Sequence, residues 1–165
     1  MYRLTVIAVG KLKEAFWKDA ISEYEKRLGA FAKVQVIEVA DTPFKSRGEA
    51  PAVMRKEAEA LRARIPKDAF TVALDPPTPR LRRASKHLMP TTEEFAEILR
   101  REGESGREIV FLIGGPLGLD PNLVKEAHHA LSLSSLTFTH GEARAILFEQ
   151  LYRAMTVLAG KTYHY

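Results

Sequence analysis

Cysteine is absent from the 165 residues of the sequence. Disulfides, catalytic thiolates and zinc sites built on cysteine are therefore excluded, and no redox chemistry through sulfur is expected. Long apolar runs are also missing, because the N-terminal segment MYRLTVIAVG is much shorter than the roughly 20 residues that a membrane-spanning helix needs, and no signal-peptide cleavage pattern follows it. We therefore expect a cytoplasmic protein that makes no contact with a membrane.

Positive charge only slightly exceeds negative charge in the sequence. Lysine and arginine number 25 against 21 aspartate and glutamate, which gives a net charge of +4. This mild bias toward anionic partners does not by itself indicate nucleic acid. Hydrophobic residues at 45% and charged residues at 28% are typical of a globular chain and argue against disorder. The length fits a single domain over residues 1–165.

Segments typical of strands and of helices alternate along the chain. The predicted strands cover residues 3–9, 34–39, 69–74, 109–113 and 133–138. The predicted helices cover residues 12–28, 50–65, a segment from 91 or 92, a segment from 120–121, and 142–159. Such alternation is typical of a parallel sheet covered by helices on both faces, so the sequence predicts an α/β fold.

Three segments follow predicted strands, at the edge of a parallel sheet where ligands bind. They are residues 74–76, the glycine-rich turn GGPLG at 114–118, and residues 134–140. Gly114 and Gly115 either let the backbone approach a ligand or only form a tight turn. The turn lacks the fingerprint of a phosphate-binding loop. The serines and threonines of the third segment either cap backbone groups or line a pocket where backbone groups contact an adenine edge.

A cluster of basic side chains follows the third predicted strand. No acidic residue occurs from Pro76 to Thr92, and the segment carries Arg80, Arg82, Arg83 and Lys86. Such cations suit contact with RNA phosphates, in an attraction that falls steeply with salt. The alternative is a solvated loop without a partner.

The last predicted helix carries two apolar stripes. One can face the sheet, whereas the second is covered either by a homodimer through this helix or by deeper burial within one chain. The stripes are Leu147, Leu151, Ala154 and Leu158, and Phe148, Tyr152, Met155 and Ala159. Arg153 follows Glu149 by four residues, a spacing that permits a local ion pair.

Several motifs together resemble one known family. They are FLIGGPLGL at 111–119, LSLSSLTFTH at 131–140, EQLYRA at 149–154 with YH at 163–164, AVGKLK at 8–13, and EYEKRL at 23–28. In this order they resemble the ribosomal RNA large-subunit methyltransferase H family, of the SPOUT class. The resemblance covers nearly the whole chain.

The resemblance implies a deep trefoil knot in the C-terminal part of the sheet and a site for S-adenosylmethionine in the knot loops. The cofactor-binding residues it implies are Leu74, Gly115, Ser134, Ser135, Leu136, Thr137, Phe138 and Thr139. It further implies methylation of N3 of a pseudouridine in the 23S ribosomal RNA hairpin that touches the decoding centre. The enzyme is expected to act on assembled ribosomes as a homodimer.

The resemblance also implies an active site shared between two subunits, in which the C-terminal tail of one meets the cofactor of the other. The residues concerned are Arg153, Tyr163 and His164, with His140 near the cofactor loop. Arg153 is expected to favour the N3 anion while His164 or a water accepts the proton, and His140 is either catalytic or structural. No metal is needed.

Two other functions compete with this interpretation. The first is a ribosome-binding protein without catalysis, which cofactor binding would distinguish. The second is a nucleotide-binding oxidoreductase, which lacks its glycine fingerprint here.

Overall fold

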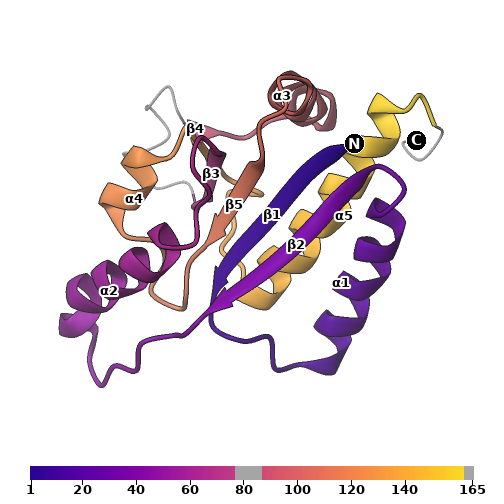
Figure 1. Ribbon diagram of the computed structural model, residues 1–165. Coiled ribbons are helices and arrows are strands. Elements are labelled where there is room, and N and C mark those ends of the chain that lie inside the picture. The colour runs from indigo at the N-terminus through magenta and orange to yellow at the C-terminus, as the bar shows by residue number, and fades with distance from the viewer. Residues whose placement is uncertain (77–86, 162–165) are drawn as a thin grey trace.

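A computed structural model describes residues 1–76 and 87–161 of the chain. In this part the strands form one parallel sheet in the order β2-β1-β5-β3-β6-β4 (Figure 1). The strands are β1 (Tyr2–Val9), β2 (Ala32–Val39), β3 (Phe70–Leu74), β4 (His87–Leu88), β5 (Ile109–Ile113) and β6 (His129–Leu131). The helices are α1 (Ala15–Leu28), the short η1 (Arg47–Glu49), α2 (Ala50–Arg62), α3 (Thr92–Glu104), α4 (Pro121–Glu126) and α5 (His140–Leu158).

Helices cover both faces of the sheet. Alternate residues of each central strand point to opposite faces, so Phe111 joins a core with α1, α3 and α5, whereas Leu112 joins a core with α2 and α4. The side chains of β3 and β5 are buried along their whole length, as expected for strands covered on both faces. The predicted α/β fold with a parallel sheet is therefore confirmed.

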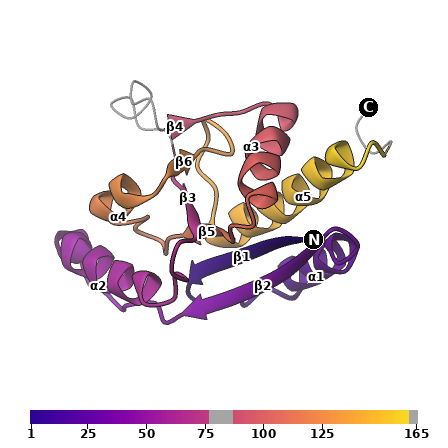
Figure 2. The same ribbon diagram turned by 45° about the horizontal axis from the view of Figure 1, so that its top comes forward.

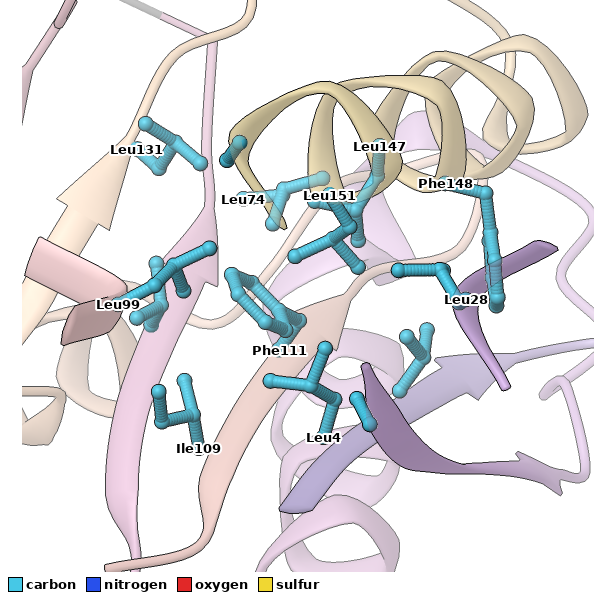
Figure 3. Close-up of a cluster of buried hydrophobic side chains, with 14 of the residues drawn as sticks. Leu4, Leu28, Leu74, Leu99, Ile109, Phe111, Leu131, Leu147, Phe148 and Leu151 are labelled. Atoms are coloured by element: carbon cyan, nitrogen blue, oxygen red, sulfur yellow. The ribbon is translucent and has the colours of Figure 1, made fainter. Parts of the chain in front are cut away.

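Helix α5 lies between α1 and α3 on one face of the sheet (Figure 2). Figure 3 shows its Leu147, Phe148 and Leu151 next to side chains of the strands. At Gly141 the contact with α1 is so close that an added Cβ would lie 2.8 Å from Cδ1 of Trp17. The close approach fixes the start of α5 against α1.

Both apolar stripes of α5 are largely covered within one chain. Phe148 and Met155 of the second stripe are buried, and the Tyr152 ring lies 6.1 Å from Tyr24 and 6.2 Å from Phe31 between ring centroids. Deeper burial within one chain, the second of the two alternatives, therefore explains the double stripe. The stripe gives no independent argument for a dimer.

The last strand of the sheet lies at a different place in the sequence from the one predicted. Residues 133–138, predicted as a strand, form a loop, and the strand is β6, which lies four residues earlier in the sequence and pairs with β3. A three-residue strand is defined by its partner across the sheet, so local alternation at 133–138 gave the wrong position. In the basic segment after β3, residues 87–88 form β4 and are not part of a loop.

Among the described residues no helix has the length and apolar character required to span a bilayer.

Candidate functional site

One cavity lies where three strands end. Leu74 ends β3, Ile113 ends β5 and Leu131 ends β6, and all three side chains line a cavity of about 270 Å³. The loops after these strands and the first turn of α5 complete its wall. The strands are parallel and neighbouring, so their carboxyl ends bring together segments that are far apart in the sequence.

The glycine-rich turn after β5 forms one side of the cavity. Residues 114–118 all line it, and the turn is closed by the Gly118 N–H, which donates to the Gly115 carbonyl at 2.9 Å. Gly118 has φ of 84°, a conformation that favours glycine. A Cβ at Gly114 would lie 2.6 Å from the backbone carbon of Gly118. The turn is therefore both tight and part of the cavity wall.

Gly115 contributes to the cavity through its backbone. A Cβ added there would point away from the cavity, 3.1 Å from Cγ1 of Val9 and 3.2 Å from a carboxylate oxygen of Glu57. Glu57 of α2 is buried, and its other oxygen accepts a hydrogen bond from the Thr42 N–H at 2.9 Å. Burial raises the pKa of this carboxyl above its ordinary value, and Asp41 adds to the effect, while the Thr42 hydrogen bond opposes it.

The loop after β6 forms the opposite side. Leu133, Ser134, Leu136, Thr137 and Phe138 line the cavity. The Ser134 hydroxyl accepts a hydrogen bond from the Leu136 N–H at 3.0 Å, which bends the loop locally. The Leu136 side chain is 70% exposed, so an apolar surface at the cavity stands open to a ligand.

Two hydrogen bonds join this loop to the loop after β3. The Asp75 N–H donates to the Leu131 carbonyl at 3.1 Å, and the Ser132 hydroxyl donates to the Asp75 carbonyl at 2.6 Å. Both bonds use backbone atoms at the strand ends. The loops after β3 and β6 are therefore fixed to each other at the cavity.

A capping box fixes the start of α5. The Thr139 hydroxyl accepts from the Glu142 N–H at 3.3 Å, and the Glu142 carboxylate accepts from the Thr139 N–H at 2.8 Å. Hydrogen bonds from Thr139 hold the pKa of Glu142 below its ordinary value. The cap orients His140 and Ala143, which line the cavity.

A buried arginine connects the start of α5 to the first two strands. Arg144 is 2% exposed and donates to the Glu38 carboxylate at 2.6 Å and to the carbonyls of Val9 and Gly10 at 3.2 and 2.5 Å. Glu38 also accepts from the Leu12 N–H at 3.0 Å. Burial raises the pKa of Glu38, but the hydrogen bonds from Leu12 and Arg144 outweigh it and lower the pKa below its ordinary value.

Most of the residues expected to hold the cofactor lie together at the cavity, but not all. Leu74, Gly115, Ser134, Leu136, Thr137, Phe138 and the separately expected His140 line it. Ser135 and Thr139 do not line it, since Thr139 caps α5 and Ser135 is exposed beside it.

Arg153 lies far from the cavity of its own chain. It follows His140 by thirteen residues of one helix, a separation of about 20 Å along the axis. Its guanidinium donates to the Glu149 carboxylate at 3.0 and 2.5 Å, which is the local ion pair that the spacing permits. Tyr163, His164, Arg80, Arg82, Arg83 and Lys86 lie outside the described residues.

Several wall residues were not among those expected from the sequence. Leu131, Leu133 and Ala143 all line the cavity. They lie within or next to the motifs, where apolar residues are equally typical of a core, so only the fold separates wall from core. Arg144, whose hydrogen bonds hold the start of α5 against β1 and β2, gave no sequence signal beyond its place in the final helix.

The cavity is suited to binding an organic ligand with an apolar body and polar edges. Its volume of about 270 Å³ lies just below the roughly 300–1,000 Å³ typical of small-ligand sites. Leucine, isoleucine and phenylalanine form much of the wall, and its polar members are Asp75, Ser134, Thr137 and His140. Within residues 1–76 and 87–161, no cluster of histidine, aspartate and glutamate could hold a metal ion.

Comparison with known proteins identifies the family. Residues 2–164 match a family described as predicted SPOUT methyltransferase. The chain is 43% identical to the ribosomal RNA large subunit methyltransferase H of Pelotomaculum thermopropionicum, with 100% of both chains covered. It is 42% identical to the protein of the same name from Bifidobacterium adolescentis, covering 98% of this chain and 99% of that one.

A solved structure shares the fold. It is described as a probable methylase family protein from Haemophilus influenzae, and it matches 98% of this chain and 70% of its own with a TM-score of 0.56 and 12% sequence identity. At this identity the likeness concerns the fold alone. The family match and the full-length relatives together show that the chain belongs to the ribosomal RNA large-subunit methyltransferase H family of SPOUT methyltransferases.

Proposed function

We propose that this protein transfers a methyl group from S-adenosylmethionine to N3 of a pseudouridine in 23S ribosomal RNA. The target lies in the hairpin that touches the decoding centre, and the enzyme acts in the cytoplasm on assembled ribosomes. The observation that carries the proposal is the convergence of three loops, after β3, β5 and β6, on one cavity in a chain of this methyltransferase family. Relatives named for ribosomal RNA methylation match over their full length.

The residues of the cavity fit the methyl donor. Leu74, Leu131 and Phe138 offer apolar contacts for its adenosine part, and the backbone of residues 134–138 offers hydrogen bonds to the adenine edge. On the other side, the turn at 114–118 has no side chain at three of its five positions and lets the backbone approach closely. The cavity is open, so a donor longer than the cavity extends toward the solvent.

S-adenosylmethionine, when bound, supplies a methyl group that is already electrophilic. The main task of the chain is therefore to hold N3 in line with that methyl group, a contribution of up to roughly 7–11 kcal/mol at its best. The imide proton on N3 must also leave. We assign the stabilisation of the resulting anion to Arg153 and the acceptance of the proton to His164 or a water, and we include Tyr163 in the catalytic set.

The catalytic role that we propose for Arg153 needs a second subunit. Because it lies about 20 Å along α5 from His140, it cannot serve the cavity of its own chain. It belongs instead to a half-buried stripe of α5 that also contains Ile146, Gln150 and Val157. We propose a homodimer through this stripe, in which Arg153 and the C-terminal tail of one subunit face the cofactor of the other.

The order of the strands supports the proposed trefoil knot. β6 is inserted between β3 and β4, which precede it in the sequence, and the chain then continues through the cavity loop into α5. Such an order is compatible with a chain that passes through its own loop, which is rare in proteins. The segment that would pass through the proposed knot is also the one that we assign to the cofactor.

A substitution that fills the cavity tests the proposed function. Ala143 lines the cavity from the first turns of α5, so Ala143→Leu should block the space for the donor while the fold is retained. We expect S-adenosylmethionine binding, measured by calorimetry, and methyl transfer to ribosomes both to fall at least tenfold. The matched control is Ala52→Leu, at an exposed position of α2 away from the cavity.

The outcomes separate the competing functions. Unchanged binding in a folded Ala143→Leu protein would place the donor elsewhere. Ribosome binding by the unmodified chain without any S-adenosylmethionine binding would instead favour the ribosome-binding protein without catalysis.

A further inference from the structure

The segment AVGKLK at 8–13 includes the end of β1 and leads toward α1, and it carries two exposed lysines. Gly10 has φ of 79° and its N–H donates to the Val39 carbonyl at 2.8 Å. Leu12 is buried, and its N–H donates to the Glu38 carboxylate at 3.0 Å. Because Leu12 points into the protein, its two neighbours in this non-helical segment, Lys11 and Lys13, point outward and are exposed.

This segment lies beside the cavity. Arg144, which directly follows the wall residue Ala143, donates to the carbonyls of Val9 and Gly10 at 3.2 and 2.5 Å. Behind the wall residue Gly115, an added Cβ would point away from the cavity and lie 3.1 Å from Val9. The segment therefore starts behind two parts of the cavity wall, at the same edge of the sheet.

The lysines keep their charge available for a partner. Within residues 1–76 and 87–161, neither Lys11 nor Lys13 forms an ion pair. Lys11 lies near enough to the Glu38 carboxylate to help lower its pKa, but that carboxylate already accepts hydrogen bonds from Arg144 at 2.6 Å and from the Leu12 N–H. Two ammonium groups on a rigid segment beside a methyl-donor cavity suit phosphate groups that must be held while a neighbouring base enters the cavity.

We propose that Lys11 and Lys13 bind backbone phosphates of the substrate RNA next to the target nucleotide. The inference rests on the proposed function, since it names the surface on which the RNA lies. It assigns a role to a motif that the cofactor site leaves unexplained. It does not depend on the basic segment after β3, which is a separate candidate for RNA contact.

The test is a double substitution with a matched control. Lys11→Gln with Lys13→Gln removes two charges beside the cavity, and Lys26→Gln with Lys33→Gln removes two exposed charges at the opposite edge of the sheet. Both variants lose the same net charge. Methyl transfer to purified ribosomes that lack the modification is measured at several salt concentrations, with S-adenosylmethionine binding and thermal unfolding as parallel readouts.

We expect KM for ribosomes to rise about tenfold in the Lys11/Lys13 variant, and the slope of log affinity against log salt to become shallower by about 1.4–1.8, as for two lost phosphate contacts. Cofactor binding and stability should not change. The conservative pair Lys11→Arg with Lys13→Arg should retain the affinity of the unmodified protein, because the charges remain.

An equal effect in the Lys26/Lys33 control, or no effect in the Lys11/Lys13 variant, would overturn the inference. In both cases the unmodified protein still methylates ribosomes, so the proposed function stands. Failure of the unmodified protein to methylate any RNA would instead reject the proposed function itself.

Discussion

At the scale of single residues, the neighbouring Gly114 and Gly115 exclude a side chain for different reasons. A side chain at Gly114 would meet backbone atoms of the turn, which cannot move aside, whereas one at Gly115 would meet Val9 and Glu57 on the core side. The GGPLG motif thus serves the turn and the packing below it as well as the cavity. This double role explains why the same residues fit both interpretations of the motif at the level of sequence.

Gly114→Ala should destabilise the protein and weaken S-adenosylmethionine binding. The added methyl group would lie 2.6 Å from the Gly118 backbone, so the turn must open, at a cost of about 1–3 kcal/mol in the free energy of unfolding. Urea denaturation and calorimetry measure the two effects. The control is Gly48→Ala, where the nearest atom would lie at an ordinary 3.6 Å, and equal stability losses in both variants would contradict the account.

Glu57→Gln should stabilise the protein at neutral pH. The folded state raises the pKa of Glu57 above its ordinary value of 4.5. The stabilising contribution of the protonated carboxyl is therefore complete below pH 4.5 and is lost as the pH rises through the raised pKa. Glutamine retains an acceptor for the Thr42 N–H and carries no charge to bury. The stability gain of the variant should therefore be absent near pH 4, grow with pH and then level off. A gain that is independent of pH would show that burial of the charge is not its cause.

At the scale of elements, the start of α5 is held by contacts that reach across the sequence. Arg144 bonds to the ends of β1 and β2, more than 100 residues away, and the Thr139 capping box fixes the first turn. Both keep Ala143 and His140 at the cavity wall. The element that closes the cavity is therefore oriented from the sheet as well as from its own cap.

Arg144→Met should lower the free energy of unfolding by about 2–4 kcal/mol. The change removes the charge-assisted hydrogen bonds to two backbone carbonyls and to Glu38, which retains only the bond from the Leu12 N–H. Chemical denaturation measures the loss. Arg100→Met provides the comparison, because Arg100 pairs with Glu97 and Glu104 on the exposed surface of α3, where such pairs contribute little to stability. Similar losses for the two arginines would argue against the connecting role of Arg144.

The helices and strands differ in how clearly the sequence predicts them, because they carry different kinds of signal. β5 is a continuous apolar run, and its bounds at 109–113 were predicted without error. β6 and β4 have three and two residues and are defined by pairing with strands that lie far away in the sequence, which local patterns do not report. The loop at 133–138 resembles a strand because its apolar residues alternate with polar ones, yet here they line the cavity.

The same limit applies to the site. The three segments at the strand ends were predicted from topology rules, because parallel strands bring their carboxyl ends to one edge. Leu131, Leu133 and Ala143 were not, since an apolar wall residue and a core residue have the same sequence signal. Only the family resemblance indicated a catalytic role for Arg153, and its distance from the cavity follows from the position of α5 in the structure.

At the scale of the whole molecule, the proposed active site is divided between two chains. The cavity loops and the start of α5 supply the cofactor part, while Arg153 lies on the far half of the same helix. One chain can therefore bind the donor without completing the proposed catalytic set. The division predicts that two different defects, one in each half, compensate each other in a mixed dimer.

Mixing two inactive variants should restore activity. One chain carries Ala143→Leu, and the other lacks residues 163–165, so each homodimer lacks one half of every site. After random exchange of subunits, half of the dimers regain one complete site, and about a quarter of the unmodified activity should return. Tritium transfer from the labelled donor to ribosomes measures it. Full activity in the truncated homodimer would remove Tyr163 and His164 from the mechanism.

The central claim is the transfer of a methyl group to N3 of a pseudouridine in 23S ribosomal RNA, and the most direct measurement is the identity of the product. Ribosomes that lack the modification are incubated with the protein and tritiated S-adenosylmethionine, the RNA is digested to nucleosides, and the labelled nucleoside is identified by chromatography and mass spectrometry. We predict a single labelled product, N3-methylpseudouridine, from the large-subunit RNA and none with the Ala143→Leu protein. Label in a different nucleoside, or no label with the unmodified protein, would contradict the account.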